Sequence, residues 1–366
     1  MNRARALAVV LMFGISLGVA GVAAEVALRV FARGASPLAR TLGSWDPYAV
    51  KVEPHGVKAY RPRAGTEFDY FESTAHENAA GYRGPLVATP KPAGTVRIIL
   101  LGESTTHGWG VVDSQTIDTY MRALLNTGAG QRYEVVNLAF DGYDAYQLWQ
   151  RLETDGVPLQ PDLIIANTGI NDVRNARFAH LTDADPRTLL WADELRRVTW
   201  EKEHGGPALG TRLKHYFYLA RLPGVLRQVR AASASGPRRA ESVYPDAAVE
   251  FSRNVGRIAD VAARLRVPLL LSTPPSVLTR PGGPAEMAPR SYWIVDKPTT
   301  QAYRDTLAAR LVTIARERSA RGERVVYVPH DMPPSDFLDD CHLTAQGNRR
   351  MAEDFVRAAT PLLGGK

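Results

Sequence analysis

Residues 96–104 read Val-Arg-Ile-Ile-Leu-Leu-Gly-Glu-Ser, and this stretch decides the fold. The run from Val96 to Leu101 is apolar apart from one arginine, which is typical of a strand buried on both faces of a parallel sheet. A glycine, an acid and a serine follow it directly. In open α/β sheets, ligands bind outside the carboxyl ends of the strands. The stretch therefore predicts a parallel α/β sheet with chemistry where its first strand ends.

Four further apolar runs alternate with segments of helical periodicity. The predicted strands cover 96–101, 134–138, 162–168, 267–272 and 324–328. Helices are expected from Asp113 or Ser114, from Asp144 toward Gly156, after Asp246, over 299–316 and over 344–359. This alternation predicts a three-layer α/β/α sandwich around a five-stranded parallel sheet.

Candidate site residues follow four of these strands at the edge where a site is expected. They include Ser104 after the first strand, Gly142 after the second, Asn171 after the third, and Asp339 and His342 after the fifth. Acyl transfer needs a nucleophile, a base, a group that orients the base, and donors to the developing oxyanion. The four strand ends supply a candidate for each role.

The roles follow from side-chain chemistry. Ser104 is the candidate nucleophile, His342 the general base and then acid, and Asp339 the group that fixes the imidazole tautomer. Asp340 is the competing acid. The candidate oxyanion hole consists of the backbone N–H groups of Ser104 and Gly142 and the side-chain amide of Asn171.

These blocks resemble those of the SGNH (GDSL-like) hydrolase superfamily, which contributes Ser, Gly, Asn and His in this chain order. The resemblance spans residues 95–360 and rests on Gly102-Glu103-Ser104, residues 137–143, residues 161–172 and residues 339–348. It implies a flavodoxin-like strand order and places the acid three residues before the histidine, at Asp339. Glu103 stands where the family motif usually has Asp, which preserves the charge.

Other chemistries have weaker support. A nucleophile elbow needs Gly-x-Ser-x-Gly, but residue 106 is Thr, and neither a GxxxxGK loop nor an HExxH helix occurs. His107 and His330 are alternative bases, for which structural roles are expected. Cys341 is the one cysteine and is expected to be a buried packing residue, so no intramolecular disulfide and no cysteine-based zinc cluster is expected. The sequence indicates no metal site, and the expected chemistry requires no cofactor.

The amino terminus predicts a membrane segment. Residues 6–24 form a run of 19 residues without charge, preceded by Arg3 and Arg5. About 20 apolar residues cross a bilayer, whereas the apolar part of a secretory signal is about 7 to 15 long, so an uncleaved anchor is favoured over a signal cut ahead of Glu25. We expect the catalytic domain outside the cytoplasm, periplasmic or extracellular.

The predicted organisation is an anchor over 1–33, a linker and extension over 34–94 that packs on the domain, and a hydrolase domain over 95–362 with an insertion at about 173–245. Proline-rich residues 274–298 form a further loop beside the site. The net charge of +7 equals the seven Lys and Arg residues between His204 and Ala240, a stretch without Asp or Glu. A solvated helix face is the simpler interpretation; an anionic membrane surface or acidic polymer is the alternative. No nucleic-acid motif accompanies the patch.

The sequence thus predicts a serine hydrolase for an acyl or O-acetyl ester of a carbohydrate or lipid. Two alternatives share the fold. An O-acyltransferase would pass the acyl group to a cell-envelope polysaccharide, and a membrane-anchored glycan-binding protein would keep the pocket without catalysis. The serine with its paired base argues against the second alternative.

Overall fold

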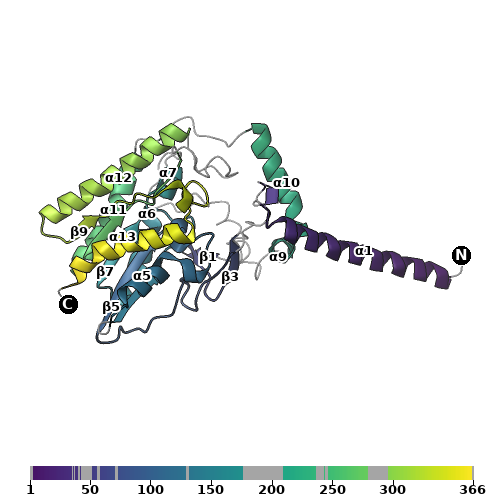
Figure 1. Cartoon of the computed structure of the whole chain (residues 1–366), viewed down its shortest axis with the longest axis horizontal. Helices are drawn as coiled ribbons and strands as arrows, with labels where there is room; N and C mark the ends of the chain where they lie inside the picture. The colour runs from purple at the N-terminus through teal and green to yellow at the C-terminus, as the bar shows by residue number, and fades with distance from the viewer. Residues whose placement is uncertain are drawn as a thin grey trace.

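The computed structural model describes residues 3–34, 36, 38–39, 42, 52–55, 58–70, 73–128, 132–175, 209–235, 243, 246–278 and 296–364. A layered domain carries the carboxyl terminus, and a long helix projects from it toward the amino terminus (Figure 1). The proline-rich residues 279–295 and most of the predicted insertion lie outside the described residues.

A five-stranded parallel sheet forms the centre of the domain. Its strands are β5 (Thr95–Gly102), β6 (Arg132–Asn137), β7 (Leu163–Asn167), β8 (Leu269–Ser272) and β9 (Val325–Tyr327), in the order β6-β5-β7-β8-β9. All four neighbouring pairs are parallel. Every residue of β5, β7 and β8 is buried, which explains their continuous apolar runs. The predicted parallel sheet and flavodoxin-like order are confirmed.

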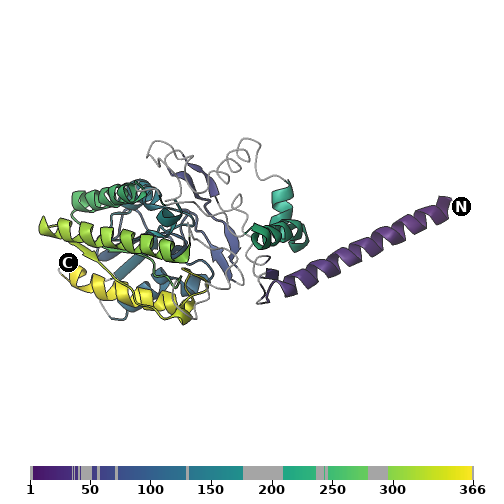
Figure 2. The ribbon, with the colours of Figure 1, turned by 90° about the horizontal axis from the view of Figure 1, so that it is seen from above.

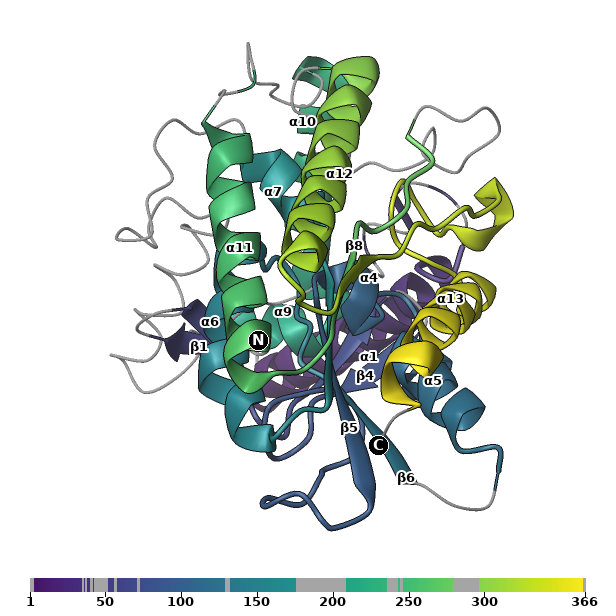
Figure 3. The same ribbon diagram turned by 90° about the vertical axis from the view of Figure 1, so that its left-hand side faces the viewer.

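Helices cover both faces of this sheet (Figure 3). On one face lie α6 (Ala145–Arg151), α11 (Ala247–Leu265) and α12 (Lys297–Ala320), which pack on Ile99 and Leu101 of β5. On the other lie α5 (Ile117–Leu125) and α13 (Ala345–Leu363), which pack on Ile98 and Leu100. Successive strand residues point to opposite faces, so both layers have a dense core. The predicted three-layer sandwich is confirmed.

The start of α5 differs from the prediction. A 3-10 turn covers Asp113–Gln115, and the α-helix begins only at Ile117. The side chain of Asp113 does not cap the helix, because its carboxylate accepts a hydrogen bond from Arg83 at 2.7 Å and lies 2.6 Å from Nδ1 of His76. A tertiary contact has replaced the local cap.

The segment between the long helix and the sheet forms two antiparallel hairpins. β1 (Val52–His55) pairs with β2 (Ala59–Pro62), and β3 (Glu67–Tyr70) pairs with β4 (Ser73–His76). The sequence predicts a linker and extension here without naming strands, because strands of four residues show little periodicity.

The long helix α1 (Arg3–Phe31) extends away from the domain (Figure 2). Its residues Val9–Phe31 are long and apolar enough to cross a membrane, and a signal sequence would have the same properties. Within the predicted insertion, residues 209–235 form α9 (Leu209–Tyr216) and α10 (Tyr218–Ser235).

Candidate active site

The ends of β5 and β9 bring Ser104 and His342 together. Ser104 opens the short helix α4 (Ser104–His107), two residues after the end of β5. Its Oγ lies 2.8 Å from Nε2 of His342, which follows a 3-10 turn at Pro334–Asp336. Nδ1 of the same ring lies 2.6 Å from Oδ2 of Asp339. The hydroxyl, the imidazole and the carboxylate therefore form one continuous hydrogen-bonded array.

Asp339 is fixed by the backbone as well as by the ring. Its Oδ1 accepts hydrogen bonds from the N–H groups of Cys341 at 2.9 Å and His342 at 2.7 Å. The neighbouring Asp340 points elsewhere: both of its carboxylate oxygens are buried without a hydrogen-bond partner among the described residues. Of the two adjacent acids, only Asp339 contacts the imidazole in this structure.

Electrostatics separate the two acids further. Burial alone would raise the pKa of Asp339, but attraction to His342 and the hydrogen bonds described above lower it below its ordinary value. Burial would lower the pKa of His342, but Asp339 raises it above 6.5. Burial, and then repulsion from Asp339, raise the pKa of Asp340. The carboxylate on the imidazole is thus held ionised, and its neighbour is pushed toward the neutral form.

The predicted oxyanion donors follow β5, β6 and β7: Ser104 and Asn171 lie at the starts of short helices, and Gly142 lies in a loop. Gly142 has φ of +77°, a conformation that residues with a Cβ rarely adopt. Asn171 lies in the first turn of α7 (Ile170–Asn175), and its amide donates to the carbonyl of Tyr143 at 2.9 Å. The side chain of Asn171 is therefore tied to the loop that carries Gly142.

The side chain of Glu103, which follows β5, binds the backbone of the segment that follows β7. Its Oε1 accepts from the N–H of Gly169 at 2.7 Å, and its Oε2 accepts from the N–H of Asn171 at 2.9 Å. The side chain is fully buried, and this burial raises its pKa despite the hydrogen bonds that oppose the shift. Glu103, the residue before Ser104, thus fixes the backbone of Asn171.

Asp172, which is half-buried, forms an acidic cluster with the buried Glu103 and Asp144. Its carboxylate accepts from the N–H of Ala145, the first residue of α6, at 3.2 Å. Burial, and then repulsion from Asp144 and Glu103, raise its pKa. The cluster links the loops after β6 and β7.

Trp109 is a site residue that the sequence analysis does not identify. Its ring packs on the imidazole of His342, with centroids 4.2 Å apart and planes inclined by 31°. The glycines on both sides of it, Gly108 and Gly110, have positive φ and allow the tight loop that brings the ring back over the site. This Gly-Trp-Gly sequence is the signal from which the loop could have been found.

His107 has a supporting position behind the site rather than a place in the array. Its Nε2 lies 2.7 Å from Oε1 of Glu77, and its Nδ1 lies 3.2 Å from Oδ1 of Asp141, with all three side chains buried. Burial would lower the pKa of His107, but Glu77 and Asp141 raise it. Because Asp141 precedes Gly142, this charged contact supports the candidate oxyanion loop.

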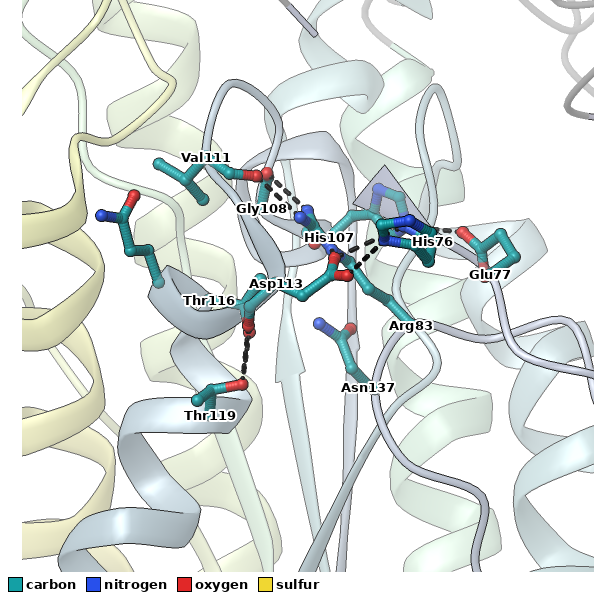
Figure 4. Close-up of polar contacts among 12 residues, drawn as sticks. His76, Glu77, Arg83, His107, Gly108, Val111, Asp113, Thr116, Thr119 and Asn137 are labelled. Carbon is teal, nitrogen blue, oxygen red and sulfur yellow. Dashed lines mark hydrogen bonds and ion pairs between the residues drawn. The ribbon is translucent and has the colours of Figure 1, made fainter. Parts of the chain in front are cut away.

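The N-terminal extension also holds the loop after α4 (Figure 4). The buried guanidinium of Arg83 donates to the carbonyls of His107 at 3.1 Å, Gly108 at 2.7 Å and Val111 at 2.7 Å, and its Nε reaches Asp113. The loop carrying Trp109 is thus fixed by a residue outside the sheet.

A clamp of two tyrosines holds the loop after β6. The hydroxyl of Tyr60 in β2 donates to the carbonyl of Asp141 at 3.0 Å, and the hydroxyl of Tyr143 donates to the carbonyl of Tyr60 at 3.0 Å. These reciprocal bonds join the first hairpin to the loop that contains Gly142.

His330, the other alternative base, belongs to a separate array. Its Nε2 lies 2.7 Å from Oγ of Ser272, and its Nδ1 lies 2.9 Å from Oδ2 of Asp354. Ser272 is wholly buried at the end of β8, and its carbonyl is engaged by the N–H of Thr168. A serine without access to solvent cannot receive a substrate, so this array has a structural role.

Cys341 is fully buried, and this burial together with the adjacent acids raises the pKa of its thiol. Because the thiolate is the reactive form, this environment suits a packing residue. Ligand atoms of Asp339, Cys341 and His342 lie within 4.8 Å of one another, but both ring nitrogens of His342 already contact Ser104 and Asp339.

Comparison with known proteins identifies the family. No match was found among curated proteins. Among solved structures, a GDSL-like lipase from Bacteroides thetaiotaomicron VPI-5482 is 15% identical, with 76% of this chain and 93% of that chain covered and a TM-score of 0.41. An acetylxylan esterase from Geobacillus stearothermophilus, solved as a catalytic mutant, is 16% identical, with 72% and 93% covered and a TM-score of 0.40. A family model for the GDSL-like lipase/acylhydrolase family matches residues 100–350, so this chain belongs to that family of ester-hydrolysing enzymes.

Proposed function

We propose that the chain hydrolyses a carboxylic ester with Ser104 as nucleophile, His342 as general base and acid, and Asp339 as the residue that orients and charges the imidazole. The observation that carries this proposal is the array in which Nε2 of His342 lies 2.8 Å from Ser104 Oγ and Nδ1 lies 2.6 Å from Asp339. A neutral imidazole in that position accepts the serine proton as the hydroxyl attacks.

The reaction proceeds in two halves. Ser104 Oγ attacks the ester carbonyl while its proton passes to Nε2, and the tetrahedral intermediate collapses when that proton is delivered to the leaving alcohol. Water then enters, gives a proton to Nε2 and attacks the acyl-serine, and Ser104 leaves with the proton returned. Asp339 keeps Nδ1 protonated and stabilises the imidazolium formed in each half.

The negative oxygen of both intermediates is bound by three donors. They are the backbone N–H groups of Ser104 and Gly142 and the amide of Asn171. One amide N–H of Asn171 already donates to Tyr143, which orients the group before substrate arrives. The bonds from Gly169 and Asn171 to Glu103 keep this loop in place while charge develops.

The substrate class is an acyl or O-acetyl ester of a carbohydrate or lipid outside the cytoplasm. The uncharged residues 6–24 of α1 anchor the chain. Arg3 and Arg5 before this run are nearly balanced by Arg29, Arg33 and Arg40 after it, so the orientation with the domain outside the cytoplasm leans on the family resemblance and on the position of Arg3 and Arg5 directly beside the run. A domain held in this way meets envelope lipids and glycans as its ester substrates. No cofactor takes part in the proposed reaction.

A fluorophosphonate probe tests the nucleophile. The wild-type chain should be labelled once, and Ser104→Ala should abolish both labelling and most turnover. Ser272→Ala is the matched control, because Ser272 also contacts a histidine paired with an aspartate but is 0% exposed, whereas Ser104 is 9% exposed. Labelling that persists in Ser104→Ala and disappears in Ser272→Ala would reverse the assignment.

The fate of the acyl group tests the reaction type. An acyl-labelled ester should release the label as free acid. Transfer of the label to an added glycan hydroxyl would instead identify an O-acyltransferase, which shares the acyl-serine half-reaction.

A further inference from the structure

The helix pair α9 and α10 contacts the end of α1 that faces the domain. The carboxylate of Glu25 accepts hydrogen bonds from the N–H groups of Tyr218 at 3.0 Å and Leu219 at 2.9 Å, the first residues of α10. The first N–H groups of a helix have no partner within that helix, so Glu25 caps α10 from another element. Arg29 donates to the carbonyl of Tyr216 at 2.6 Å and lies over the ring of Tyr218.

These contacts place the pair at a defined level along α1. Glu25 lies within the apolar stretch Val9–Phe31 but is the first charged residue after the uncharged run 6–24. At 1.5 Å per residue this run alone is about 28 Å long, nearly the thickness of the apolar layer of a bilayer, so α1 can leave that layer at Glu25. Figure 1 shows α10 running across the axis of α1 rather than beside it. A helix that crosses a membrane-spanning helix at its end lies along the membrane surface.

One face of the pair exposes large apolar side chains. Leu209, Leu213 and Tyr216 follow one another at helical spacing on α9 and are 71%, 42% and 63% exposed. Phe217 and Leu219, the next large apolar residues along the chain, are 48% and 44% exposed. Elsewhere in the described part of the sheet domain, exposed large apolar residues such as Leu86 and Val312 are far apart in the sequence. A concentration of exposed apolar side chains of this kind is typical of a contact surface.

Basic residues accompany this face. Arg212 is exposed between Leu209 and Tyr216, and Arg227 is exposed further along α10. No Asp or Glu occurs between His204 and Ala240. Apolar side chains flanked by cations, without acids, complement a bilayer surface that has anionic headgroups over acyl chains.

We infer that α9 and the start of α10 lie in the headgroup layer of the anionic bilayer that α1 spans, with Leu209, Leu213 and Tyr216 buried among the lipids. This assignment rests on the anchoring of α1 proposed above. It adds a second membrane contact, which limits rotation of the domain about its single anchor. An acidic polymer is the rival partner, but it would not require the row of apolar side chains.

The full chain reconstituted in lipid nanodiscs tests this contact. A fluorophore sensitive to polarity is attached to Leu213→Cys, with Cys341 buried in the domain, and the same probe on Val312→Cys of α12 serves as the control. The discs contain phosphatidylcholine alone or with about one-third phosphatidylglycerol. In the anionic discs, the probe at 213 should shift to the blue, be quenched by spin-labelled lipid and return toward the aqueous signal at high salt. The probe at 312 should report water throughout.

Charge reversal sharpens the test. Arg212→Glu with Arg227→Glu should lower the ratio of lipid-buried to aqueous signal at position 213 by about tenfold or more, while ester hydrolysis in detergent stays unchanged. A probe at 213 that reports water in both kinds of disc, or responds equally in both and ignores salt, overturns the inference. A response only to an added acidic polysaccharide overturns it in favour of the polymer. Loss of the chain from the discs would refute the anchoring by α1. This result differs from a failure of the proposed hydrolase function, because hydrolysis by Ser104 would persist.

Discussion

The acid of the proposed triad can be tested by replacing two adjacent residues. Asp339→Asn keeps an oxygen for the N–H groups of Cys341 and His342 but turns an N–H donor toward Nδ1 of the imidazole. Nδ1 must then accept, so the ring proton moves to Nε2, the atom that should receive the proton of Ser104. Loss of the correct tautomer costs about 10⁴ in kcat in other Ser-His-Asp enzymes, or about 5 kcal/mol of activation free energy.

Asp340→Asn is the matched control. Its carboxyl has no hydrogen-bond partner in the described part of the chain, and burial and Asp339 raise its pKa, so asparagine resembles its neutral form in size and charge. The expected loss is less than about tenfold in kcat. Steady-state hydrolysis of a chromogenic acyl ester measures both variants, with circular dichroism to verify folding. Greater damage from Asp340→Asn than from Asp339→Asn would refute the assignment of the acid.

Four further measurements examine the site and the anchor. Asn171→Ala should lower kcat by roughly a hundred- to a thousandfold, about 2.7 to 4 kcal/mol, with KM nearly unchanged; a loss confined to KM would mean that Asn171 only holds substrate. Because Asp339 raises the pKa of His342 and the proposed base is the neutral ring, kcat/KM should rise with pH through an apparent pKa above 6.5, and this apparent pKa should be lower in Asp339→Asn. An apparent pKa that is unchanged in the variant would mean that Asp339 does not control the protonation of His342. His107 also has a raised pKa, so its protonated form should stabilise the fold fully below about pH 6.5, and this stability should be lost as pH rises through the folded-state pKa. Urea unfolding of His107→Gln should lack that loss. Full-length protein should resist carbonate extraction from membranes, whereas a soluble product that lacks residues 1–24 would indicate a cleaved signal.

The sequence predicts the sheet well because burial on both faces leaves a strong signal. The runs at 96–101 and 134–138 overlap β5 and β6, and the order of the five strands follows from the family resemblance. The residues at which strands begin and end are less predictable. The strand predicted from Val267 begins two residues later as β8, because the N–H of Val267 instead bonds the carbonyl of Ala262 in α11.

Residues that act through tertiary contacts leave little signal. Ser104, Gly142, Asn171 and the residues near His342 are recognisable because they follow strands in a known order. Trp109 and Glu77 are not, because their importance arises only when the loop and the extension fold onto the sheet. The predicted roles at the site remain proposals, although the structure brings Ser104, His342 and Asp339 into contact.

The contacts of the N-terminal extension with the loop after α4 determine where the domain can be cut away from α1 without disturbing the site. A protease that cuts ahead of Val52 would release both hairpins with the domain, and with them Tyr60, Glu77 and Arg83. A cut between Arg83 and Thr95 would break the covalent link between the sheet and these supports, so that only hydrogen bonds and buried contacts would hold them on the Trp109 loop and the Gly142 loop. We expect the first cut to leave ester hydrolysis intact and the second to lower it.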